Sequence, residues 1–140
     1  MFPGINIYSG SKGLGAALTN PTCLSFRKGT IVNQYPIRYK GRVYPDAEAA
    51  FHAHKVFGDH AQQAELISQL FVCKLQQHRR LFDEIIKRGG VEWLATCSHH
   101  SGAKTPEYKY WEGDGLASPF IAAIVKGFKA ELSRKQTETW

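Results

Sequence analysis

The sequence predicts a helix-rich α+β domain, in which a small antiparallel sheet or hairpin packs against about four to five helices. Apolar residues recur with helical spacing in several segments that begin at capping residues. Residues that favour β-structure instead cluster in short runs within the first third of the chain. The 140 residues fit one domain, residues 1–140, in which we expect residues 133–140 to be a frayed tail.

The composition favours a folded, soluble, cytoplasmic protein. Hydrophobic residues make up 43% of the chain and aromatic residues 12%, which argues against disorder. No run of about 18 apolar residues is present to cross a membrane, and the first residues lack the features of a secretory signal. Three widely spaced cysteines fit a reducing compartment better than a disulfide framework. We therefore expect cytoplasmic localisation and no membrane partner.

The charge balance favours anionic ligands. Lysine and arginine outnumber aspartate and glutamate by 18 to 12, and the net charge is +6. This excess suits nucleotides, sugar phosphates or nucleic acid, although it serves solubility equally well. The basic residues are scattered and form no long basic arm, so binding to duplex nucleic acid is not a leading hypothesis.

The first third of the chain is expected to supply the β-structure. Residues 1–30 are rich in Gly, Ser, Thr and Asn and predict a loop-dominated entry, with one short β-like piece at Ile5–Tyr8. Further β-forming runs lie at Thr30–Val32 and Ile37–Tyr44. A tight turn at Lys40-Gly41-Arg42 would fold the second run into a hairpin.

A helix follows the hairpin. Pro45 cannot continue a helix from before it, and Asp46 can cap the free amides of the first turn. Alanines favour the helix, which we expect to end near Phe57, before Gly58.

Three further helices are predicted by spacing and caps. Asp59 caps a helix over about 60–77, and another covers about 79–88 before two glycines. Residues 91–96 could be helical or extended, and residues 97–115 form a long polar and aromatic loop. Ser118-Pro119 begins a final amphipathic helix to about Leu132.

Three side chains on the helix that Asp46 caps could take part in acid–base chemistry together. Glu48, His52 and Lys55 stand at i, i+4 and i+7, which places them on one stripe of the helix. A carboxylate among alanine and phenylalanine is desolvated or paired with a cation, and either state suits acid–base chemistry. An exposed Glu-His-Lys ladder that only stabilises the helix is the alternative from these residues alone.

The stretch GRVYPDAEAAFHAHK resembles the signature of the NADAR (YbiA-like) family, in which a strand ends in Tyr-Pro and a helix bears Glu, an aromatic residue and Lys. Here these positions are Tyr44-Pro45, Glu48, Phe51 and Lys55. The similarity continues in order through most of the chain, at Leu18-Thr19-Asn20, KLQQHRRLFDEII, GGVEWLATCSH and YWEGDG.

This resemblance implies a YbiA-like fold and a hydrolase that breaks the bond between ribose C1 and a nitrogen. Relatives act on phosphoribosylamino-pyrimidine intermediates of riboflavin synthesis or on ADP-ribose attached to a nucleobase. The expected partner is therefore a nucleotide or an ADP-ribosylated substrate, including modified nucleic acid. No cofactor is expected.

The implied roles make physical sense for an oxocarbenium-like transition state. Glu48 would stabilise the cation or activate water, and Asp114 would orient water or sugar hydroxyls. Trp111 would stack on the base or cap the ribose, while Asn20 and Lys55 suit ribose hydroxyls and phosphate.

Three other candidates have weaker grounds. His52 could deliver a proton to the leaving nitrogen by its geometry alone, and Phe51 takes the aromatic position of the motif. Lys12 lies in the segment GSKGLG, which either forms a simple loop or places this lysine near a phosphate. No metal is expected, because the histidines and cysteines lack the spacing of known metal sites.

Two alternative functions stay open. The chain differs from the family pattern at Ala49 and Glu112, which motivates a non-catalytic module that binds ADP-ribose or a related nucleotide. The positive charge also allows a basic interaction protein for single-stranded nucleic acid.

Overall fold

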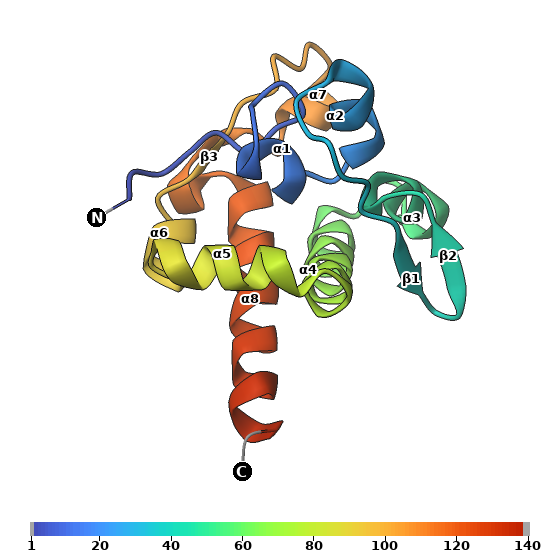
Figure 1. Cartoon of the computed structure of the whole chain (residues 1–140). Helices are drawn as coiled ribbons and strands as arrows, with labels where there is room; N and C mark the ends of the chain where they lie inside the picture. The colour runs from blue at the N-terminus through green and yellow to red at the C-terminus, as the bar shows by residue number, and fades with distance from the viewer. Residues whose placement is uncertain (1, 139–140) are drawn as a thin grey trace.

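Helices dominate the part of the chain that the structure, a computed structural model, describes, which is residues 2–138. Figure 1 follows the chain from its N-terminus to the long helix α8. The predicted helix-rich α+β class is confirmed, since eight α-helices in these residues accompany two short antiparallel strand pairs. The elements are α1 (Leu14–Leu18), α2 (Thr22–Lys28), β1 (Ile37–Tyr39), β2 (Arg42–Tyr44), α3 (Ala47–His54), α4 (His60–Gln77), α5 (Arg79–Arg88), α6 (Val91–Leu94), β3 (Ser98–His99), α7 (Pro106–Lys109), β4 (Gly113–Asp114), η1 (Gly115–Ala117) and α8 (Pro119–Glu138).

Helices α4 and α8 form the centre of the fold. Leu70 on α4 and Ile124 on α8 are fully buried. The two helices approach closely at Gly127, where an added Cβ would lie 2.7 Å from the carbonyl oxygen of Ser68. The Ser68 hydroxyl also donates to the Ala123 carbonyl at 2.6 Å. A glycine is thus required at this crossing, and the buried polar group is satisfied across it.

The predicted hairpin is present as β1 and β2. Lys40 and Gly41 both have positive φ, 50° and 78°, as a two-residue hairpin turn requires. The Tyr44 hydroxyl lies 2.9 Å from His54 Nε2, which holds the hairpin against α3.

The cap of α3 also joins it to α2. Asp46 accepts hydrogen bonds from the backbone amides of Ala49 at 2.9 Å and of Cys23 at 3.0 Å. The predicted cap is therefore confirmed. The helix ends at His54 rather than near Phe57, because Lys55 has an extended backbone with ψ 145°.

The first thirty residues are less loop-like than predicted. They contain α1 and α2, which are 5 and 7 residues long and have no side-chain cap. Their inner faces are held by tertiary packing, since Leu18 and Ser25 are fully buried. The expected strand at Thr30–Val32 is absent from the described structure, and Ile5–Tyr8 contributes one parallel bridge, from Asn6 to Ser98.

The last helix begins as predicted but continues further. Ser118 Oγ accepts a hydrogen bond from the amide of Ile121 at 3.2 Å, as a helix cap does. The helix runs through Glu138 rather than ending near Leu132, and its last turns extend beyond the rest of the fold (Figure 1). Most of the expected frayed tail is thus helical, while residues 139–140 lie outside the described residues.

A buried carboxylate anchors this helix to its neighbours. Glu131 is fully buried and accepts hydrogen bonds from Arg79 at 2.6 Å, Arg134 at 2.7 Å and Gln76 at 3.0 Å. Burial raises the pKa of Glu131, but these donors outweigh it and lower the pKa to about 2. No helix within residues 2–138 is both long and apolar enough to span a bilayer.

Candidate functional site

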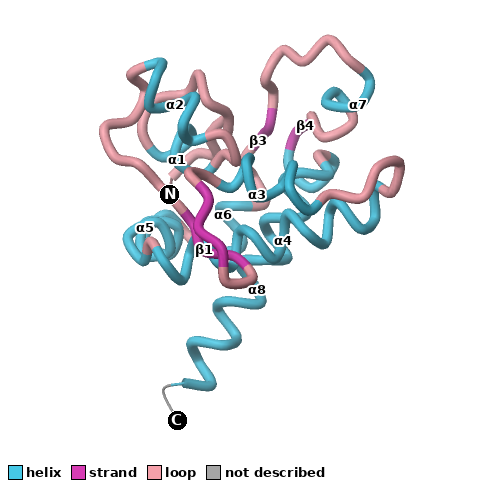
Figure 2. Tube along the Cα trace, turned by 90° about the vertical axis from the view of Figure 1, so that its right-hand side faces the viewer, coloured by secondary structure: helices cyan, strands magenta, loops and turns pink. Residues whose placement is uncertain are grey.

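A cleft of about 250 Å³ lies between segments that are far apart in the sequence. Figure 2 shows α2 and the loop from β3 to α7 rising on opposite sides at the same end of the molecule. Both contribute to the cleft, together with α3, α4 and the start of α8. Five of the predicted site residues line it: Asn20, Glu48, Phe51, Lys55 and Trp111.

Glu48 is held at the cleft by the start of α3. Its backbone amide donates to the Asn20 carbonyl at 3.2 Å, which ties the first turn of the helix to the preceding loop. The side chain is 33% exposed and lies 3.4 Å from His52 Nε2. Burial raises the pKa of Glu48, and the attraction of His52 only partly opposes this shift. The carboxyl group therefore exchanges protons closer to neutral pH than an ordinary glutamate.

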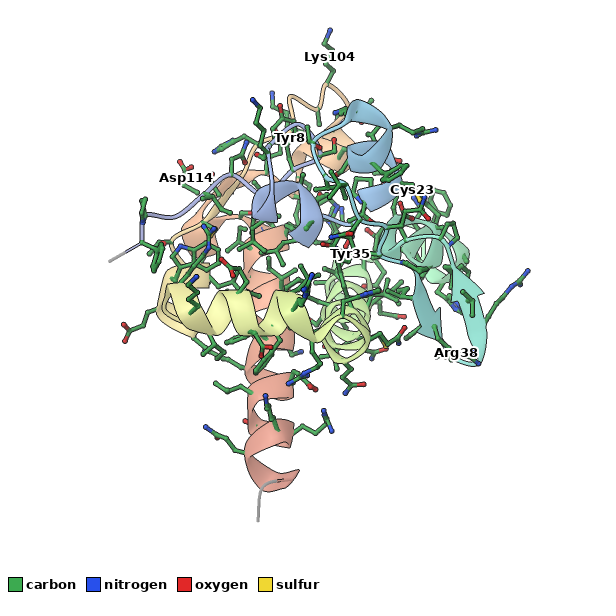
Figure 3. All side chains as sticks on the ribbon, viewed as in Figure 1. Tyr8, Cys23, Tyr35, Arg38, Lys104 and Asp114 are labelled. Carbon is green, nitrogen blue, oxygen red and sulfur yellow. The ribbon has the colours of Figure 1, made fainter. Side chains whose placement is uncertain are left out.

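Three predicted residues lie elsewhere. His52 contacts Glu48 but is absent from the cleft lining. Asp114 has an 86% exposed side chain, binds His100 at 2.8 Å and lies on the side of the molecule away from α3 (Figure 3). Lys12 lines a separate groove on the surface. The prediction that Asp114 and Lys12 join the other residues is thus corrected, since β4 and the glycine-rich segment carry them away.

Lys55 enters the cleft from the C-terminal end of α3. Its amide still donates to the Phe51 carbonyl at 2.8 Å, so it keeps its helical position, and its side chain is only 9% exposed. Its ammonium group lies 3.2 Å from Glu107 Oε1 on α7 and 5.8 Å from the centre of the Phe51 ring. A cation is thus held inside the cleft by a carboxylate on the opposite wall.

A fully buried lysine holds the loop of Thr19 and Asn20, which forms part of the cleft wall. Lys74 on α4 donates from Nζ to the Thr19 carbonyl at 2.6 Å. Thr19 and Asn20 line the cleft, and Asn20 receives the amide of Glu48. Burial lowers the pKa of Lys74 to about 7, although the nearby Asp46 raises it. Lys74 therefore positions the loop on which the first turn of α3 rests.

Several cleft residues could not be found from sequence. Lys28 donates to Ser9 Oγ at 2.7 Å, and its Nζ lies 5.6 Å from the centre of the Tyr8 ring. His99 enters from β3 and Tyr108 from α7. Each is a single residue in an unremarkable local sequence. Only long-range contacts bring them together, so no spacing signal could have marked them.

The loop that carries Trp111 is tied at its base. The Trp111 ring contacts His60 and Tyr110 edge-on, with ring centres 5.9 Å and 4.9 Å away. The next residue, Glu112, accepts hydrogen bonds from the amide and hydroxyl of Ser101 at 2.6 Å and 2.7 Å. Glu112 therefore joins the end of this loop to its beginning at Ser101. Between them, Lys104 points away from the molecule (Figure 3).

No family model, curated protein or solved structure matches the chain. Among residues 2–138, no three His, Cys, Asp or Glu side chains gather as a metal site would require. The cleft combines a carboxylate of raised pKa, an imidazole, two ammonium groups and an aromatic wall. Such a set can bind a small phosphorylated ring compound and move protons on it.

Proposed function

We propose that this chain is a hydrolase that cleaves the N-glycosidic bond between ribose and a nitrogenous base or amine, in a phosphoribosyl or ADP-ribosyl compound. The observation that carries the proposal is Glu48, a carboxyl group of raised pKa in a cleft with Asn20, Lys55 and Trp111. The resemblance of the surrounding sequence to the NADAR family supports the same chemistry.

The reaction would proceed by loosening of the C1–N bond. The bonding electrons move to the nitrogen, and the sugar gains oxocarbenium character that the Glu48 carboxylate stabilises. Water then forms the new C1–O bond and loses a proton, while the nitrogen takes one up. Asn20 would bind the sugar hydroxyls and Trp111 would contact the base or ribose.

The size and charge of the cleft favour a compact substrate. Its volume of about 250 Å³ is just below the range of about 300–1,000 Å³ typical of small-molecule sites. One ribose phosphate would fill most of it and leave the base near the mouth. Lys28 and Lys55 are the two lysines of the lining, and they would bind the phosphate.

A product assay tests this proposal. The protein is incubated with ribonucleoside 5′-phosphates, a phosphoribosylamino-pyrimidine and an ADP-ribosylated nucleobase, and released ribose 5-phosphate or ADP-ribose is measured by mass spectrometry. We expect Glu48→Gln to abolish release without lowering thermal stability. Glu92→Gln, at an exposed position on α6, is the matched control and should keep full activity. Turnover retained in Glu48→Gln would exclude the mechanism.

A non-catalytic module for ADP-ribose is the second candidate. It is favoured by the position of Asp114, which the resemblance assigns to water orientation and which lies outside the cleft. Calorimetry separates the two functions, because stoichiometric binding of ADP-ribose without any product would identify a binding module.

A further inference from the structure

The tautomer of His99 is fixed by the fold. Its Nδ1 lies 2.7 Å from the carbonyl oxygen of Ile7, and a carbonyl can only accept a hydrogen bond. Nδ1 therefore carries the hydrogen, and the neutral ring keeps its lone pair on Nε2. The Ile7 amide in turn donates to the Ser98 carbonyl at 2.8 Å, so the acceptor is itself held by β3.

The rest of the ring faces the cleft. His99 is half-buried, lines the same cleft as Glu48 and packs against Phe120, with ring centres 4.5 Å apart. In the part of the chain that the structure describes, no hydrogen-bond partner is found for Nε2. The lone pair is therefore available to a molecule in the cleft.

The surroundings keep this imidazole neutral at pH 7. Burial lowers the pKa of His99 below its usual range, the Ile7 carbonyl and Glu112 oppose the shift, and His100 adds to it. The other titratable side chains of the cleft are those of Glu48, Glu107, Lys28, Lys55, Tyr8 and Tyr108.

We infer that His99 is the general base of this cleft, whose Nε2 takes the proton of the attacking water. The inference rests on the proposed hydrolysis. As the C1–O bond forms, Nε2 accepts the water proton and the C1–N electron pair leaves with the nitrogen. The imidazolium then returns its proton to solvent, from which the nitrogen takes one up. Glu48 is thereby left to stabilise the sugar cation, and the step needs no contribution from His52, which does not line the cleft.

Adjacent histidines provide a matched pair for the test. His100 has a partly exposed side chain bound to Asp114 and does not line the cleft. On the substrate that the wild-type protein cleaves, we expect His99→Gln to lower kcat by about 100-fold or more, as loss of a general base does. KM should change little, and His100→Gln should stay near wild type. Added imidazole should restore part of the activity of His99→Ala, which a purely structural role would not allow.

Two further measurements keep the outcome interpretable. His99→Asn retains a donor for the Ile7 carbonyl and serves where the glutamine variant fails to fold. Nitrogen NMR of the wild-type protein should show hydrogen on His99 Nδ1, and ribose 5-phosphate should shift Nε2 of His99 but not of His100.

The two proposals fail in different ways. If Glu48→Gln is inactive while folded His99→Gln or His99→Asn matches wild type, the His99 role is wrong and the hydrolase stands. A hydrogen on Nε2 in the free protein also contradicts the His99 role. If the wild-type protein cleaves none of the compounds, the proposed function itself fails.

Discussion

At the scale of single residues, burial of ionisable groups around the cleft changes how stability depends on pH. Glu48 has a raised pKa in the folded chain. Such a group contributes stability that is fully present below its unfolded pKa, about 4.3, and is lost as pH rises through the folded pKa. Ionisation of the Glu48 side chain therefore lowers the stability of the fold.

Glu48→Gln should remove this effect. We expect its Tm at pH 7 to equal or exceed that of wild type, and the difference to shrink near pH 4, where the wild-type carboxyl group is protonated. Thermal unfolding at both pH values measures this. A Tm at pH 7 well below wild type would show that the carboxylate stabilises the fold.

The pKa of Lys74 is shifted in the opposite direction from that of Glu48. Its pKa is about 7 in the fold, whereas an unfolded lysine has a pKa near 10.4. Above pH 7 the unfolded chain binds more protons at this residue, so the free energy of unfolding should rise with pH. We expect an increase between pH 7 and 8 in denaturant titrations, below the pKa of about 8.5 at which the thiols of the unfolded chain ionise.

Two variants test whether Lys74 is the source of this increase in the free energy of unfolding with pH. Lys74→Met should remove most of the rise, whatever its effect on absolute stability, since it also leaves the Thr19 carbonyl without its donor. Lys129→Met, at an exposed position on α8, is the control and should keep it. Equal slopes in both variants would place the buried amine outside this pH range.

Sequence could identify cleft residues only where a motif marked them. Glu48 and Lys55 were found because they share a short pattern with Tyr44-Pro45. His99 and Lys28 could not be found, because each owes its place to contacts with residues far away in the chain. The prediction that Asp114 lies in the cleft was wrong for the same reason, since the position of Asp114 depends on how the loop before it folds.

At the scale of elements, the loop between β3 and β4 has a charged attachment to α3. Glu107 on α7 pairs with Lys55 inside the cleft, and Glu112 holds the loop at Ser101. An anionic ligand must compete with Glu107 for the ammonium group. The Glu107 side chain of this pair is about half exposed, and exposed ion pairs contribute roughly 0–1 kcal/mol to stability.

Glu107→Gln should therefore tighten binding of ribose 5-phosphate, by up to about fivefold from a pair of this strength. Titration calorimetry at low and high salt measures the change, which should diminish as salt screens the ammonium group. Lys55→Met is the counterpart and should weaken binding. Weaker binding by Glu107→Gln would mean that this carboxyl group contacts the ligand itself.

The bounds of α4 and α5 were predictable, whereas those of the short helices α1 and α2 and the end of α8 were not. The predicted helices over 60–77 and 79–88 are confirmed as α4 and α5, because Asp59 and Gly89 mark their ends. Asp59 accepts the amide of Gln62 at 3.0 Å. Helices α1 and α2 have no such caps and too few residues for a periodic pattern, so only tertiary packing defines them.

At the scale of the whole molecule, the crossing of α4 and α8 sets the frame for the cleft, since both helices contribute to its walls. An alanine at Gly127 would favour an isolated helix by about 1 kcal/mol. Its Cβ would meet backbone of the facing helix at 2.7 Å, however, and such overpacking costs roughly 1–3 kcal/mol.

We therefore expect Gly127→Ala to lower the free energy of unfolding despite its better helix propensity. Chemical denaturation gives the value, and Ala130→Gly on the exposed side of α8 calibrates propensity alone. A more stable Gly127→Ala protein would mean that the two helices can separate without cost.

The bridge between Asn6 and Ser98 joins an early segment to one made much later, and Ile7 and His99 depend on that junction. The wall beside them includes Phe120 from α8. Because synthesis runs from the N-terminus, a nascent chain holds the first wall residues long before their partners exist. We therefore expect the cleft to be complete only after the start of α8 has been synthesised.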